Sequence, residues 1–358
     1  MSVALSNCLN DLRCPSCVER LGAVGDARTG TLLACQACSE LFPIIDGIPR
    51  MLLRSMREAL VSKSLSDGVD LRQVQTAKSF GFEWSRFSQM YDEWESAFFE
   101  YMQPHGPSFF QGKRVLDAGC GSGRYAYHAA KHGAKVWAVD LGPAIEITQH
   151  NTATIGGVYA VQADILKLPF APESFDFICS IGVLHHLANP EEAFHNLLRY
   201  LKPGGEIQIY VYWKPENQPV KTALLSLISA LRGLTTRLPY RVVYALSYPA
   251  AAIAWATFVW PYLMMKYLPG CDTFASRTPM RQYAAYPFRV CVNDQFDRFS
   301  APIENRYTRS EVEFWLRHAG LEEPLIIANY GWVASGRKPV VKATSQQATA
   351  RAAEYSRC

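Results

Sequence analysis

The sequence has few charged residues and little net charge. Lys, Arg, Asp and Glu make up 19% of the 358 residues, and 36 bases against 32 acids leave a formal charge of +4. So small a basic excess does not indicate a nucleic-acid-binding protein by electrostatics alone. Because 49% of the residues are hydrophobic, the chain can bury a sizeable core, which excludes wholesale disorder. At roughly 100–200 residues per domain, the length indicates about two domains.

The sequence also lacks the apolar stretch of a secretory signal near its start. Asp11 and Arg13 interrupt any such run, so we expect a protein of the reducing cytoplasm. Ten cysteines are too sparse for a small disulfide scaffold. Four of them nevertheless form a pattern near the N-terminus.

This pattern consists of two C-x-x-C pairs. Cys14 pairs with Cys17 and Cys35 with Cys38, with seventeen residues between the pairs. The spacing is typical of a structural zinc ribbon, in which each pair supplies two thiolates from one tight turn. Four thiolates fill the tetrahedral shell of Zn²⁺, so we predict a structural and not a catalytic metal.

The segment 41–52 follows the second pair and predicts two strands joined by an Asp-Gly turn. Together with the cysteines, it resembles the small zinc-ribbon proteins that bind and activate tRNA and release-factor methyltransferases. The resemblance implies a stabilising or docking domain over residues 1–55, joined here to a larger one. It does not imply that RNA is the substrate.

A linker and an aromatic-rich segment are expected over 56–112. Nine aromatic residues lie between Ser79 and Gln103, many of them three or four positions apart. This spacing predicts an amphipathic helix packed on a core. A lid over a bound ligand is the alternative.

Residues 113–212 alternate predicted strands and helices. The first unit is a strand, a glycine-rich loop, a helix and a strand ending in an acid, at 114–118, 119–123, 124–132 and 136–140. Glycines let a backbone approach a ligand closely, and a helix N-terminus offers free N–H groups. The terminal acid, Asp140, can accept both hydroxyls of a ribose.

The loop reads D-x-G-x-G-x-G from Asp117, with Arg124 where a dinucleotide motif requires its last glycine. This form resembles class I S-adenosylmethionine-dependent methyltransferases. Further blocks agree with that family in order and spacing, namely Asp164 after a third strand, 174–187, and the turn L-K-P-G-G at 201–205. The resemblance covers about 100 continuous residues and implies an α/β fold with a doubly wound, Rossmann-like sheet of seven strands.

The resemblance also implies which residues bind S-adenosyl-L-methionine. Asp117 would meet the amino group of the cofactor, Asp140 the ribose hydroxyls and Asp164 the adenine amino group. The other expected contacts are Gly119, Cys120, Gly121, Gly123, Leu141, Ile165 and Ile181. The remaining task of the protein is to position the nucleophile in line with the methyl group.

His185 and His186 follow the fourth predicted strand, at the sheet edge where ligands bind in open α/β folds. A neutral imidazole there can take a proton from a hydroxyl or amine nucleophile, with His186 as the first catalytic candidate and His185 as the second. In the resembling family the same segment also serves loop structure, with one imidazole packed inward, so both interpretations stay open.

The core is expected to resume at 308–341, after about ninety inserted residues at 213–307, and residues 342–358 indicate a disordered tail. In the resembling family, such insertions select the substrate. Candidates to face the substrate are Tyr210, Tyr212, Trp213 and 297–306.

Within the insertion, residues 242–265 contain no charge, and four basic residues precede them. Such a helix would extend roughly 36 Å, enough to span a bilayer, although Pro249 and Pro261 argue against a span. A second interpretation is an apolar helical hairpin that docks on a membrane surface or takes a lipophilic substrate. The third is a buried lid or a homodimer face.

These observations predict an enzyme that methylates a small lipophilic metabolite, in the cytoplasm or peripherally at its membrane. Methylation of RNA or of a translation protein ranks second, because no Lys/Arg stripe with interleaved aromatics is visible. A non-catalytic assembly module ranks third, since the glycine loop and both cofactor acids are intact.

Overall fold

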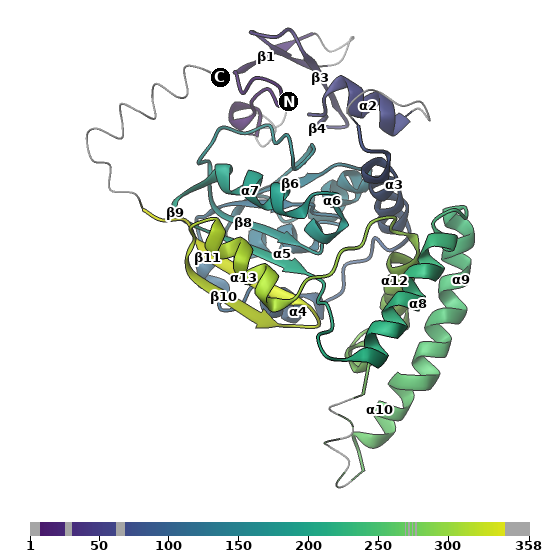
Figure 1. Cartoon of the computed structure of the whole chain (residues 1–358). Coiled ribbons are helices and arrows are strands. Elements are labelled where there is room, and N and C mark those ends of the chain that lie inside the picture. The colour runs from purple at the N-terminus through teal and green to yellow at the C-terminus, as the bar shows by residue number, and fades with distance from the viewer. Residues whose placement is uncertain are drawn as a thin grey trace.

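The computed structural model describes residues 8–25, 31–61, 69–268, 270, 273, 275 and 278–340. The tail expected at 342–358 lies outside the described residues. Figure 1 shows three parts: a small sheet at one end, a larger sheet covered by helices in the middle, and a group of helices that projects at the other end.

The small sheet is an antiparallel ribbon with the strand order β1-β2-β3-β4. Its strands are β1 (Leu21–Val24), β2 (Leu32–Cys35), β3 (Leu41–Ile45) and β4 (Ile48–Pro49). The predicted turn between β3 and β4 is present, and its central residues Asp46 and Gly47 have φ values of 52° and 79°. Two positive φ values are what the tightest hairpin turns require, and Asp-Gly supplies them at little cost.

The ribbon is joined firmly to the larger sheet. The Met51 amide donates to the Gln162 carbonyl over 2.7 Å, and the Arg50 guanidinium contacts Glu146 at 3.0 Å. Phe42 and Met51 are buried in the same apolar cluster as strands of the larger sheet. The ribbon therefore shares a core with its neighbour instead of hanging from a linker.

The larger sheet has seven strands in the order β10-β11-β9-β8-β5-β6-β7. The strands are β5 (Arg114–Ala118), β6 (Lys135–Asp140), β7 (Val158–Gln162), β8 (Phe175–Ile181), β9 (Leu201–Val211), β10 (Glu322–Ala328) and β11 (Trp332–Arg337). Five strands are parallel from β9 to β7, and β11 is antiparallel to both of its neighbours. The doubly wound, seven-stranded fold predicted from the sequence is confirmed.

Helices cover both faces of this sheet. They are α4 (Trp94–Tyr101), α5 (Arg124–Lys131), α6 (Ala144–Thr152), α7 (Pro190–Tyr200) and α13 (Arg309–His318). Along β6 the buried side chains alternate between two clusters. Trp137 packs in the cluster of α7 and α13, whereas Val136 packs in that of α4 and α5. This alternation is expected of a strand with both faces buried.

The aromatic-rich segment differs from the prediction made for it. It forms two helices instead of one, α3 (Leu71–Arg86) and α4, separated by residues 87–93. Most of the expected linker is also helical, in α2 (Arg54–Val61) and the first half of α3. The start of α3 is set by Asp70, whose carboxylate accepts the Arg72 amide as an N-cap. The prediction of a single helix was based on the aromatic residues, and this cap precedes them in the sequence.

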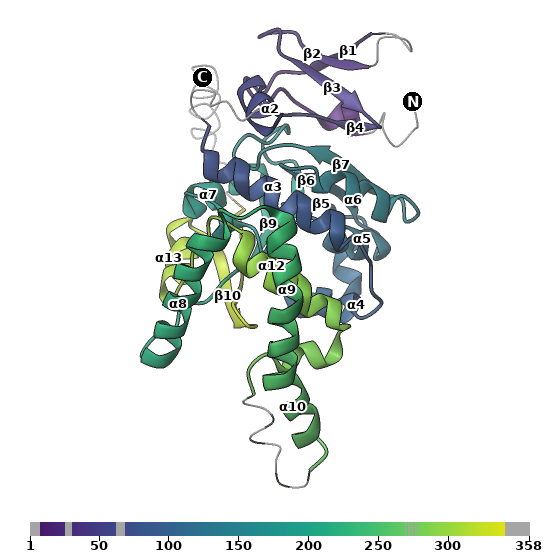
Figure 2. The same ribbon diagram turned by 90° about the vertical axis from the view of Figure 1, so that its right-hand side faces the viewer.

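The insertion is helical, as expected. Its main elements are α8 (Pro219–Thr235), α9 (Tyr240–Ala254), a π-turn (Trp255–Val259), α10 (Trp260–Met265) and α12 (Phe288–Ser300). Helix α9, the π-turn and α10 form one continuous run, and α12 contacts both α8 and α9. Figure 2 shows these helices extending away from the sheet, on the side opposite to the ribbon. Pro261 cannot donate a backbone bond, and the π-turn directly before it accommodates that loss.

Candidate functional site

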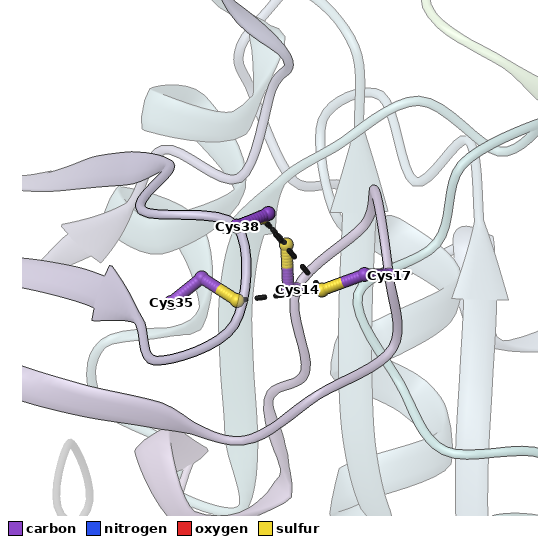
Figure 3. A group of neighbouring side chains, drawn as sticks. All are labelled: Cys14, Cys17, Cys35 and Cys38. Atoms are coloured by element: carbon purple, nitrogen blue, oxygen red, sulfur yellow. Dashed lines mark hydrogen bonds between the residues drawn. The ribbon is translucent and has the colours of Figure 1, made fainter.

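The four paired cysteines converge in one cluster at the edge of the ribbon (Figure 3). Their sulfur atoms all lie within 4.8 Å of one another. The Sγ of Cys17 is 3.4 Å from that of Cys35, and the Sγ of Cys14 is 3.5 Å from that of Cys38. A tetrahedron of Zn–S bonds of about 2.3 Å has edges of about 3.8 Å. The cluster therefore fits a structural Zn²⁺ held by all four thiolates.

The predicted glycine loop lies at the carboxyl end of β5, and its backbone requires glycine. Gly119, Gly121 and Gly123 have φ values of 86°, 55° and 82°. A Cβ atom at Gly119 would lie 2.4 Å from a methyl carbon of Val183, and one at Gly123 would lie 2.9 Å from Thr148. The loop is thus packed so closely that any side chain at these positions would clash.

Two predicted acids flank this loop at different depths. Asp140 accepts the amides of Gly121 and Gly142 at 3.1 and 2.9 Å, so it fixes the loop. Asp117 is 1% exposed, and its Oδ2 has no hydrogen-bond partner among the described residues. Burial raises the pKa of Asp117 to about 7 and that of Asp140 to about 6. A buried carboxylate oxygen without a donor is costly, and an ammonium group would satisfy it.

The third acid, Asp164, follows β7 and contacts helix α3. Its carboxylate accepts the Leu166 amide at 2.9 Å, and the side-chain amide of Gln73 lies 3.2 Å from both of its oxygens. An N–H₂ group therefore already meets Asp164, as an adenine amino group would. This contact brings α3 to the carboxyl edge of the sheet.

Helix α3 crosses the glycine loop further along its length. The indole of Trp84 lies against Gly121, where an added Cβ would be 2.8 Å from its Nε1. Gly81 lies against Pro143, where an added Cβ would be only 2.4 Å from the ring. Gln73, Gly81 and Trp84 thus place α3 over the predicted cofactor residues. The lid that the sequence left as an alternative is consistent with this position.

The two predicted catalytic histidines have different surroundings. His185 is fully buried and stacks on Tyr212 at 3.9 Å, and its ring nitrogens have no partner among the described residues. Burial lowers its pKa well below the ordinary value, so the ring stays neutral. The Nδ1 of His186 lies 2.6 Å from the Ile303 carbonyl. A carbonyl only accepts, so Nδ1 carries a proton, and in the neutral form of the ring Nε2 keeps a free lone pair.

This lone pair faces a carboxylate of the insertion. The Nε2 of His186 is 3.9 Å from Oδ1 of Asp297, which has no hydrogen-bond partner among the described residues. The other oxygen, Oδ2, accepts the Tyr212 hydroxyl at 2.9 Å. Two acceptors therefore face each other with no donor between them. A ligand with an O–H or N–H group would supply the donor that these two acceptors lack.

Two more acids lie beside Asp297, one half-buried and one buried. Asp294 accepts the Tyr283 hydroxyl at 2.6 Å, and Glu83 on α3 is 2% exposed, with Oε2 unpartnered within the described part of the chain. Burial, followed by the charges of Asp297 and Asp294, raises the pKa of Glu83 well above its ordinary value. Arg124, at the start of α5, supplies a positive charge to the same region.

A small cavity opens between α3, the start of α5 and α12. Aromatic side chains form part of its wall, and Arg124 and Asp294 add charge. Its lining residues are Trp84, Phe87, Gln89, Tyr91, Trp94, Arg124, Arg289, Val290, Asn293 and Asp294. An aromatic wall with a few convergent polar groups is typical of small-molecule sites, but at about 20 Å³ this cavity is too small to hold more than a water molecule unless α3 or α12 moves.

Stability measurements at two pH values test the unusual state of Glu83. The folded protein holds the proton of Glu83 to a higher pH than the unfolded chain does. The contribution of Glu83 to the free energy of unfolding therefore falls as pH rises above the ordinary pKa of 4.5. We expect Glu83→Gln to be more stable than the native chain by about 1–3 kcal/mol at pH 8. The difference should close toward pH 4. Urea unfolding measures it, with the exposed Glu93→Gln as control, and a difference independent of pH would contradict the assignment.

The other predicted contacts are also placed. The Cys120 thiol is buried and lies 3.3 Å from the Thr148 hydroxyl, directed into α6. Leu141 packs against the cluster of α2 and α3. Ile165 and Ile181 are buried in the two faces of the sheet.

Of the substrate-facing candidates, Tyr212 reaches Asp297, and Tyr210 packs edge-on against Tyr101. Trp213 lies under the Lys221 ammonium, which is 5.4 Å from the ring centroid. Sequence reasoning missed Gln73, Glu83 and Asp294, which no motif marks.

Comparisons with known proteins identify the central part of the chain. Residues 116–209 match the family model described as "Methyltransferase domain". The match extends from β5 into β9 and covers about a quarter of the chain.

Curated relatives agree with this family but differ in their named substrates. "Probable tRNA methyltransferase 9B" of Homo sapiens is 35% identical over 125 residues, covering 33% of this chain and 24% of that protein. "Ubiquinone biosynthesis O-methyltransferase" of Pseudomonas entomophila (strain L48) is 32% identical over 122 residues, covering 33% of this chain and 51% of that protein. The chain spans about a quarter to half the length of these relatives.

A solved structure is similar over more of the chain. It is a complex between the Haloferax volcanii Trm112 methyltransferase activator and a putative methyltransferase. The TM-score is 0.41 at 16% identity, over 77% of this chain and 100% of that chain. At this TM-score nothing about function follows from the similarity.

Proposed function

We propose that this chain is an S-adenosylmethionine-dependent methyltransferase whose acceptor is a small, lipophilic molecule with a dissociable O–H or N–H proton. The observation that carries the proposal is the set of cofactor groups beneath α3. The glycine loop is closely packed, Asp140 fixes it, and the buried Asp117 has an oxygen without a donor. These groups suit a ligand with a ribose and an ammonium group.

The resemblance to S-adenosylmethionine-dependent methyltransferases gives each of these residues a role. Asp117 would receive its ammonium group, Asp140 its ribose hydroxyls and Asp164 its adenine amino group. Bound there, S-adenosylmethionine supplies a methyl group on a positively charged sulfur. The protein must then bind the acceptor, orient it and exclude water from the reacting groups.

We assign proton removal to His186 and Asp297. The tautomer of His186 is set by Ile303, so its Nε2 can accept a proton, and Asp297 is held by the Tyr212 hydroxyl. An acceptor O–H or N–H that lay to one side of this 3.9 Å pair could donate to either atom. His185 has no such partner, so we assign it to the packing of the loop.

The aromatic wall of the cavity supports an apolar acceptor. Trp84, Tyr91 and Trp94 contribute to it, and the Arg124 guanidinium lies 5.2 Å from the Trp94 ring centroid. At about 20 Å³ the cavity must widen before it admits an acceptor, and the chemistry of its wall then suits a compact, partly aromatic or aliphatic molecule.

Methylation of RNA or of a translation protein is the second candidate. Two observations favour it: the resemblance of the ribbon to activators of such enzymes, and relatives named for tRNA, among them the "tRNA U34 carboxymethyltransferase" of Hydrogenovibrio crunogenus (strain DSM 25203 / XCL-2). The small net charge of +4 places it second. A non-catalytic module is disfavoured by the unpaired acceptors at His186 and Asp297.

Transfer of a labelled methyl group distinguishes these candidates. The purified chain is incubated with methyl-tritiated S-adenosylmethionine and, separately, with an organic lipid extract, an aqueous metabolite fraction and bulk tRNA. We expect tritium to enter the organic fraction. Label in tRNA would favour the second candidate, and label in no fraction would contradict the proposal.

A further inference from the structure

The helical insertion exposes large apolar side chains in an ordered pattern. On α8 they recur every three or four residues, which places them on one face of the helix. They are Val220, Leu224, Leu227, Leu231 and Leu234, between 44% and 81% exposed. Because the opposite face of α8 contacts α12, this apolar face has no partner in the described chain.

Helices α9 and α10 carry a second exposed row. Its members are Val242, Leu246, Ile253, Trp260 and Met264, which recur at intervals of four and seven residues. The inner side of α9 is different, since Val243, Ala251 and Ala254 are buried in the cluster that includes α12. The run Tyr240–Met265 is long and apolar enough to cross a membrane by length and composition, yet only 28% of its most apolar window is buried.

The charges around this surface have one sign. Between residues 217 and 268 there is no Asp or Glu, but there are five bases. Arg232 is buried and paired with Glu304 at 2.7 Å. The other four bases are exposed and form no ion pair with another described residue, namely Lys221, Arg237, Arg241 and Lys266.

We propose that the insertion surface, defined as the exposed faces of α8 and of α9–α10, docks on an anionic lipid bilayer. An apolar face bordered by bases matches a membrane interface, where side chains enter the acyl region and Lys or Arg meet anionic headgroups. A second copy of the chain is a poorer partner, because its identical basic surface would repel this one.

The geometry favours lying on the bilayer over crossing it. One side of α9 packs on α12 through buried residues, so the run cannot be surrounded by lipid without separating from its core. Figures 1 and 2 place the ribbon at the far end of the molecule from α10. A chain docked through the insertion would therefore keep its ribbon in water.

Docking would also bring the bilayer close to the proposed acceptor cavity. Helix α12 contacts α8 and α9 with part of its surface and lines the cavity through Asn293 and Asp294. A lipophilic acceptor could then reach the cavity from the lipid phase. Only this last step rests on the proposed function, because docking itself requires no catalysis.

Vesicle sedimentation tests the docking surface with the full chain. Sucrose-loaded vesicles of phosphatidylcholine alone are compared with vesicles that also contain phosphatidylglycerol. We expect binding to the anionic vesicles to be at least about tenfold tighter and to weaken as salt rises. A chain that stays in the supernatant with both vesicles would overturn the proposal.

Paired variants separate the two contributions. Leu227→Glu with Leu234→Glu should abolish sedimentation, whereas Val24→Glu, at an exposed apolar position of the ribbon, should not change it. Arg237→Ser with Arg241→Ser should remove the preference for anionic vesicles, and the exposed Arg309→Ser should keep it. Calorimetric binding of S-adenosylmethionine by each variant reports whether it is folded. Unchanged docking in the leucine variant would exclude the insertion surface.

Two further outcomes would assign the surface to another partner. A native chain that is dimeric in solution, becomes monomeric with Leu227→Glu and ignores vesicles would show that a second copy covers the surface. A chain that resists both high salt and alkaline washing would span the bilayer. Failure of methyl transfer with intact vesicle binding would instead contradict the proposed function and leave docking in place.

Discussion

Replacing Cys14 and Cys17 with serine is expected to remove the bound zinc and to unfold the ribbon. Two remaining thiolates cannot complete a tetrahedral site, and structural zinc contributes about 10–16 kcal/mol of apparent binding free energy in small zinc domains. Metal analysis should fall from about one zinc per chain to none, with a lower thermal midpoint by circular dichroism.

The consequence should extend to the cofactor site. The ribbon contacts Gln162 at the end of β7, two residues before Asp164. Loss of the ribbon should therefore loosen the loop that carries Asp164 and weaken cofactor binding. The control is Cys358→Ser, which lies in neither cysteine pair. Normal zinc content or an unchanged midpoint in the double variant would contradict a structural zinc.

Asp140→Ala should weaken the binding of S-adenosylmethionine by at least about 100-fold. The variant loses the two hydrogen bonds expected from the ribose hydroxyls to the carboxylate, and each hydrogen bond to a charged group is worth about 1.5–3 kcal/mol. The native carboxylate accepts the amides of Gly121 and Gly142, so the variant also frees the glycine loop. The loss should appear equally for the methyl donor and for its demethylated product, since both carry the ribose.

Calorimetric titration measures this affinity directly. Asp92→Ala removes an exposed acid that is not among the predicted cofactor residues and should bind the donor as the native chain does. Asp140→Asn keeps one acceptor oxygen and should fall between the native chain and the alanine variant. Native affinity in Asp140→Ala would place the cofactor elsewhere.

The parts of the site that could be predicted from the sequence are those whose residues lie close together in the chain. Asp117, the loop glycines and Asp140 belong to one strand-loop-helix-strand unit, and a parallel sheet brings its carboxyl edge together by topology alone. The cysteine pairs are similar, because each C-x-x-C fixes two ligands on one turn. Such local patterns determine the position of their residues independently of how the rest of the chain folds.

The parts that were missed depend on contacts between distant elements. Gln73 becomes significant only because α3 crosses the sheet edge and meets Asp164. Glu83 and Asp294 lie more than 200 residues apart in sequence, and only the packing of α3 on α12 makes them neighbours. The insertion had three open interpretations, because an uncharged helix has the same sequence whether one of its faces meets protein, lipid or a second copy.

The central claim is that the glycine loop and the three acids beside α3 hold the methyl donor. A crystal structure of the chain with the demethylated product, S-adenosylhomocysteine, tests this most directly. The account predicts the ribose at Asp140, the ammonium at Asp117 and the adenine amino group at Asp164, beside the Gln73 amide. A ligand bound elsewhere, or no ligand at these residues because α3 fills the space, would contradict the account.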